Sequence, residues 1–161
     1  MFQTLLTILN KELALYNEIA EVVEKQTDII KKGDIDGLNE LLKTQQKYVT
    51  SITVLEEERQ KELARIFPDK RELATITDCI EMAAGQEKVQ LSKVYENLMS
   101  VLQKIREINE LNQQLLEQSL EFVNFSMNLL RPQKDNLNYG PPNKKQLSQP
   151  MHTSSVFNTE V

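Results

Sequence analysis

The chain has 161 residues, of which 40% are hydrophobic and 27% charged, with no tryptophan and only four glycines. This composition is typical of one helical domain with a narrow core, and it excludes a thick globular interior. The net charge of -5 disfavours a nucleic-acid binder, because such proteins present a basic face to the phosphates. We therefore expect no nucleic-acid partner.

A single cysteine and a charged N-terminal region indicate where the protein works. Cys79 has no partner for an internal disulfide, which favours a reducing compartment, and we expect it to be a small buried hydrophobe. The start of the chain lacks the basic segment of a signal peptide, and Lys11 arrives before any long apolar run. No run approaches the ~18 apolar residues of a transmembrane helix. We expect a cytoplasmic protein with no membrane insertion.

The first predicted helix covers residues 2–32. Apolar residues in it alternate at spacings of three and four, as in a coiled-coil seam, and further apolar residues widen the stripe toward a second neighbour. The seam consists of Leu6, Leu9, Leu13, Tyr16, Ala20, Val23, Thr27 and Ile30, and the second set of Leu5, Ile8, Leu15, Ile19, Val22 and Ile29. The run from Lys31 to Asp34 then combines terminal cations, a glycine and an N-cap aspartate, which predicts a tight turn into the next helix.

The second predicted helix covers residues 35–67 and keeps the same alternation. It ends before Pro68, because proline disfavours a helical conformation in the residue that precedes it. A short helix is predicted over residues 70–84, and Gly85 marks a break.

The third long helix is predicted over residues 86–131, with a heptad seam that runs from Leu91 to Leu129 and a stop at Pro132. The sequence therefore predicts an all-α fold: an elongated antiparallel helical bundle or coiled coil of three long helices with a short connecting helix. Its helical domain would be residues 1–131. Residues 132–161 are rich in polar residues and proline, and we expect them to form a flexible, disordered C-terminal tail.

Helix lengths predict an uncovered end. At 1.5 Å per residue the three helices are about 45, 50 and 69 Å long, so the second helix covers the third only to about residue 118. The last dozen helical residues would overhang, with apolar positions over about 220° of the helix circumference. An exposed apolar end of this kind invites a protein partner or self-association. In the alternative interpretation, the short helix or a kink covers this end.

Residues for enzyme chemistry are nearly absent. The one histidine, His152, lies in the predicted tail, and metal sites need clustered histidine, cysteine or carboxylate ligands. No glycine-rich phosphate loop occurs, and the carboxylates lie among lysines and arginines as solubilising pairs on helix surfaces. We expect no enzyme activity, no metal and no cofactor.

Asn112 is a polar residue in the apolar seam of the third long helix. A buried asparagine fixes the register of a coiled coil at a cost in stability. A half-exposed asparagine at the rim of the bundle explains the sequence equally well, and both readings stay open at this point.

Several short motifs, in this order and at this total length, resemble the flagellar FlgN-like export chaperones. They are Glu12-Leu13, the turn Lys31–Asp34 before Leu38, Leu55-Glu56-x-x-Arg59, Ile108-Asn109-x-x-Asn112-x-x-Leu115-Leu116, Leu130-x-Pro132 and Leu137-Asn138-Tyr139-Gly140. The resemblance implies a cytoplasmic type III secretion chaperone that binds the C-terminal helices of the hook-filament junction proteins FlgK and FlgL and prevents their premature assembly. It also implies delivery to the cytoplasmic domain of the export gate, with Tyr139 as the docking residue.

The apolar end of the third helix is the predicted substrate site, where an amphipathic cargo helix would pack. Its predicted residues are Asn112, Leu115, Leu116, Leu120, Phe122, Val123, Phe125, Met127, Leu129 and Leu130. A chaperone of this type would be a monomer or weak homodimer. Two alternatives are a structural coiled-coil protein that self-associates and a chaperone of another flagellar substrate.

Overall fold

The computed structural model describes residues 1–130, and their regular secondary structure is entirely helical. The helices are α1 (Gln3–Lys32), α2 (Ile35–Ile66), α3 (Ile76–Met82) and α4 (Gly85–Leu130). The all-α prediction is thereby confirmed for this part of the chain, whereas the predictions for the tail, Tyr139 and His152 lie outside the described residues. The chain divides into two units, Met1–Phe122 and Val123–Val161, and the boundary between them falls within α4.

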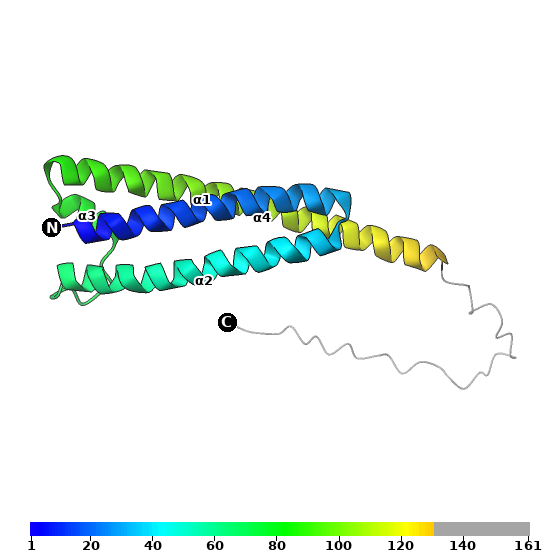
Figure 1. The fold of residues 1–161 in the computed structure, drawn as a ribbon, viewed down its shortest axis with the longest axis horizontal. Helices are drawn as coiled ribbons and strands as arrows, with labels where there is room; N and C mark the ends of the chain where they lie inside the picture. Colours follow the sequence, from blue (N-terminus) through cyan, green and yellow to red (C-terminus); the bar gives the residue numbers. More distant parts are fainter. Residues whose placement is uncertain (131–161) are drawn as a thin grey trace, which may run out of the picture. The chain divides into compact units, whose positions relative to one another are not determined.

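The first unit is an elongated bundle of three long helices. Figure 1 shows α1, α2 and α4 side by side, with α3 at the end where the chain begins. The chain reverses at Gly33, so α2 is antiparallel to α1, and the connection through α3 brings α4 back parallel to α1. This is the predicted arrangement, and it follows from one tight turn and one longer return.

The predicted seams form the interior of the bundle. Every seam residue of α1 is buried or half-buried, and so is every residue of its second stripe. Helix α1 therefore packs on two neighbours, as its wide apolar stripe predicts. Helix α2 is covered far less, and its buried residues are Ile52, Glu62, Leu63 and Ile66.

The largest buried cluster joins all four helices at the end of the bundle that contains α3. Its buried residues are Phe2, Leu5, Leu6, Leu9, Leu63, Ile66, Cys79, Ala83, Leu91, Val94 and Leu98. Cys79 is fully buried in this cluster, as predicted, and burial raises the pKa of its thiol to about 11. The thiol therefore acts as a packing group.

Hydrogen bonds close the turn between α1 and α2 on both sides. Gly33 has φ 71° and its amide donates to the carbonyl of Ile30, while the amide of Asp34 donates to the carbonyl of Ile29. The Asp34 carboxylate then accepts a hydrogen bond of 2.9 Å from the amide of Gly37. One residue thus ends α1 in a left-handed conformation and the next caps α2, as the sequence predicts.

Replacing Gly33 by alanine is expected to destabilise the bundle by about 1–2 kcal/mol, because an L-residue is strained in the left-handed region. A Cβ at this position meets no atom within 4 Å, so the loss comes from the backbone alone. Gly33→Asn is the matched control and is expected to cost less, since asparagine tolerates this conformation. Urea unfolding followed by circular dichroism measures both; equal losses would contradict the backbone explanation.

The short connecting helix is shorter than predicted. The prediction of a helix over 70–84 is wrong for residues 70–75 and 83–84, because α3 covers only Ile76–Met82. Thr75 begins it with a capping box, in which the Thr75 side chain accepts from the amide of Asp78 and the Asp78 carboxylate accepts from the amide of Thr75. The hydrogen bond from Lys70, followed by those from Thr75, lowers the pKa of Asp78 to about 2. These bonds fix the start of α3 at Thr75.

Candidate functional site

Helices α1 and α4 run in parallel at a constant register. The amide of Phe2 donates to the Glu87 carboxylate, and the hydroxyl of Thr27 donates to the side-chain oxygen of Asn112. In both pairs the two residues are 85 positions apart in sequence. The same offset places Lys32, the last residue of α1, level with residue 117 of α4. Helix α1 therefore offers no cover to α4 beyond about this point, a level close to residue 118, where the helix lengths predict that cover by the second helix ends.

Asn112 lies inside the bundle. Its side chain is 5% exposed, its amide nitrogen donates a hydrogen bond of 3.0 Å to the carbonyl of Val23, and its oxygen accepts from the hydroxyl of Thr27 at 2.5 Å. Both ends of the amide are thus paired with α1, which costs less than leaving either end unpaired in the interior. The buried reading is therefore correct, and Asn112 has almost no surface to offer a partner.

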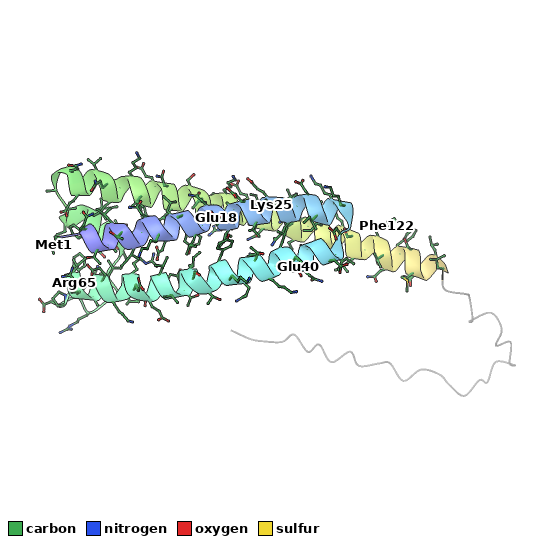
Figure 2. The ribbon with its side chains drawn as sticks, viewed as in Figure 1. Met1, Glu18, Lys25, Glu40, Arg65 and Phe122 are labelled. Carbon is green, nitrogen blue, oxygen red and sulfur yellow. The ribbon has the colours of Figure 1, made fainter. Side chains whose placement is uncertain are left out.

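Beyond the level of Lys32, the apolar side chains of α4 are exposed. Leu115 is still half-buried, whereas Phe122 is 70% exposed. Figure 2 shows Phe122 at the end of the first unit opposite to Met1 and Arg65. We call residues 115–130 the apolar end of α4. Its exposed apolar residues are Leu116, Leu120, Phe122, Val123, Phe125, Met127, Leu129 and Leu130.

Two apolar stripes run along this part of the helix. One continues the buried seam of α4 in the same heptad register, through Leu115, Phe122 and Leu129. The other repeats at spacings of four and three along a neighbouring face. It consists of Leu116, Leu120, Val123, Met127 and Leu130. Two stripes at coiled-coil spacing are suited to packing against partner helices.

The structure thus groups nine of the ten predicted substrate-site residues on one helical segment and separates Asn112 from them. The burial of two polar residues was not predicted: Glu12 and Gln26 are buried within the second apolar stripe of α1. Each occupies a position that continues the spacing of Ile8, Leu15 and Val22, and this spacing was the signal that could have revealed them. Gln26 donates a hydrogen bond of 2.7 Å to the side chain of Gln45.

Within residues 1–130, no cluster of three or more histidine, cysteine or acidic side chains is arranged to hold a metal ion. Among the helices in this described part, none combines the length and the apolar content needed to cross a membrane. The feature with a clear binding chemistry is therefore a surface for protein: an apolar helix face with leucine, phenylalanine and methionine side chains.

Two comparisons with known proteins gave matches. The family described as "FlgN protein" matches residues 1–146. The chain is also 33% identical over 139 residues to the Bacillus subtilis (strain 168) protein described as "Uncharacterized protein YvyG", and the alignment covers 86% of each chain. No solved structure matches.

Proposed function

Because the chain belongs to the FlgN family of flagellar chaperones, we propose that it is a cytoplasmic type III secretion chaperone of the hook-filament junction proteins. It binds the C-terminal helices of FlgK-like and FlgL-like proteins, keeps them from assembling early and delivers them to the flagellar export gate. The apolar end of α4 is the proposed cargo site, made by the nine residues of 115–130 named above.

The observation that carries this proposal is the exposed continuation of a buried seam. The heptad positions of α4 are covered by α1 up to the level of Lys32, and the same register then continues through Phe122 and Leu129 without cover from α1. A helix from another protein that runs parallel or antiparallel to α1 can extend this packing. The cargo then occupies the place that a longer α1 would take.

The size of the surface is sufficient for a specific complex. Burying one leucine or phenylalanine contributes about 1.5–3 kcal/mol, so four or five anchors exceed the cost of ordering a cargo helix. Met127, Phe122 and Phe125 offer contacts that adapt to different partners, which suits a chaperone with two related cargos.

Size-exclusion chromatography with light scattering tests the proposal. The full chain is mixed with purified hook-filament junction proteins, and the expected result is a stable complex that disappears when their C-terminal helices are deleted. If the chain instead forms a large defined assembly alone and no complex, the self-associating structural protein is favoured. If the chain binds another flagellar protein, such as the filament cap protein, and does not bind the junction proteins, then that protein is the cargo.

Tyr139 is the proposed docking residue for the export gate. Tyr139→Ala is expected to leave the affinity for junction proteins unchanged and to weaken binding to the cytoplasmic domain of the gate protein at least about tenfold, about the loss expected for one aromatic anchor. Isothermal titration calorimetry of both interactions measures the difference. Tyr139→Phe is the matched control, which separates the ring from the hydroxyl. Unchanged gate affinity in Tyr139→Ala would exclude the role.

A further inference from the structure

A second surface of the first unit is a groove between α2 and α4, beside the segment 67–77 that leads into α3. The groove has a volume of about 740 Å³, which lies within the range of binding sites for sizeable ligands. Glu12 and Tyr16 of α1 contribute to its lining, together with residues of α2 and α4. None of its lining residues belongs to the apolar end of α4, and the proposed cargo binding leaves it unused.

Both sides of the groove are helical stripes. The α2 side repeats at spacings of three and four over about 16 Å, or three helical turns, and the α4 side shows the same spacings over about 10 Å, or two turns. The lining residues of α2 and its C-cap are Glu56, Arg59, Gln60, Leu63, Ala64 and Phe67, and those of α4 are Tyr95, Leu98, Met99 and Leu102. Because Met99 and Leu102 are exposed, the groove offers apolar surface along the direction of the helices. One further helix laid in it would complete a four-helix bundle.

The lining of the groove includes a buried carboxyl group with one unpaired oxygen. Glu12 is 1% exposed, and its Oε2 accepts a hydrogen bond of 3.4 Å from Arg59, whereas Oε1 has no partner. Tyr16 donates to Glu56 at 3.4 Å. Both distances are long for hydrogen bonds, so these polar groups are only loosely paired. An unpaired buried oxygen is rare in folded proteins and needs an explanation.

The same cluster lacks one positive charge. Burial raises the pKa of Glu12, and the positive charge of Arg59 partly opposes this shift. Glu56 adds a second carboxylate, so that two carboxylates lie beside a single guanidinium. Of the other lining cations, Lys70 pairs with Asp78, and within residues 1–130 neither Lys70 nor Arg71 forms an ion pair with Glu12 or Glu56. A lysine or arginine side chain would provide both a positive charge and a donor, while its aliphatic stem packs on the apolar sides of the groove.

We propose that this groove binds an amphipathic helix of another protein, which inserts one lysine or arginine side chain from its apolar face toward Glu12. The helix packs between α2 and α4, and the basic group donates to Glu12 Oε1. The groove therefore selects for a cation within an otherwise apolar helix face, a pattern that differs from the purely apolar contacts of the apolar end of α4.

Two synthetic peptides test the proposal. Each has 15 residues, blocked ends, one hydrocarbon staple on its polar face and leucines on its apolar face. The two differ at one position, the centre of the apolar face, which is lysine in one peptide and norleucine in the other. Fluorescence anisotropy with the full chain is expected to show binding of the lysine peptide at least about tenfold tighter than that of the norleucine peptide, the discrimination typical of one charge-assisted contact. Equal affinities, or no binding of either peptide, would overturn the proposal.

Methionine methyl signals locate the binding. The chain has five methionines, of which Met99 lines the groove and Met127 lies in the apolar end of α4. With ¹³C-methyl methionine, the lysine peptide is expected to shift the Met99 signal and leave the Met127 signal in place. A shift of Met127 alone would place the peptide at the proposed cargo site and contradict a separate groove site.

Three variants complete the test. Glu12→Gln is expected to reduce the preference for lysine over norleucine to less than about twofold, because the charge partner is lost. Met99→Glu, at an exposed position that does not depend on the buried pair, is expected to abolish binding of both peptides. Val89→Glu is its matched control on the same helix, since Val89 is exposed but lies outside the groove. An unchanged lysine preference in Glu12→Gln, or unchanged binding in Met99→Glu, would exclude this site.

Discussion

Replacing Phe122 and Leu129 together by aspartate is expected to abolish capture of the hook-filament junction proteins while the chain stays helical. Both side chains are exposed, so the free protein loses little packing. In the complex each would bury its apolar surface, which contributes about 1.5–3 kcal/mol per residue. The expected loss is therefore at least about 3 kcal/mol, or about 100-fold in Kd. Titration calorimetry with a junction protein measures it.

The control for this variant changes the same helix elsewhere. Val89 and Leu111 are also exposed apolar residues of α4, and both precede the apolar end. Val89→Asp with Leu111→Asp adds the same charge and is expected to leave the affinity for cargo within about twofold. Circular dichroism checks that both double variants keep their helix content. If the Phe122 and Leu129 variant binds cargo as tightly as the unaltered chain, the cargo site lies elsewhere.

The helices and their seams could be predicted because each depends on neighbouring residues. Gly33 and Asp34 specify a turn by their own conformations, and apolar spacing indicates which face is buried. The break at Gly85, three residues beyond Met82, is also local, because Gly85 has a left-handed φ of 56°. The start of α3 was misplaced although Thr75 and Asp78 form a recognisable capping box, because the apolar residues around it are too few to show a period.

The partners of Asn112 could not be predicted from the sequence. Its hydrogen bonds join residues 85 and 89 positions apart, so they depend on the register of α4 against α1. The sequence shows that a polar residue occupies a seam position, and only the packed bundle decides whether its amide finds a carbonyl there. With Val23 and Thr27 as partners, Asn112 fixes that register. The register then determines where α1 ceases to cover α4.

The groove beside Glu12 could not be predicted for a related reason. Sequence spacing shows that Glu12 interrupts an apolar stripe, but not whether a neighbouring cation reaches it. In the structure Arg59 pairs with one carboxylate oxygen only. The depth of the groove depends on the distance between α2 and α4, which no short segment of sequence encodes. Tertiary packing therefore determines both the free oxygen and the space above it.

Leu91→Ala is expected to destabilise the protein by about 2–5 kcal/mol, the largest loss of stability that we predict for one substitution. Leu91 is 0% exposed within the cluster that joins all four helices, so truncation removes buried methyl groups and leaves a cavity. Leu120→Ala is the matched control on the same helix. It is expected to change the free energy of unfolding by no more than about 0.5 kcal/mol, because Leu120 is 62% exposed. Urea unfolding followed by circular dichroism measures both.

The same pair of variants tests whether the apolar end of α4 is open in solution. If Leu120→Ala costs as much as Leu91→Ala in the free protein, another part of the chain or a second copy covers Leu120, and the proposed cargo site is already occupied. If it costs little alone but reduces the stabilisation that a junction protein confers, Leu120 is buried only in the complex. Since a ligand stabilises the folded state by an amount that rises with the logarithm of its affinity for that state, the second result links the exposed leucine directly to cargo binding.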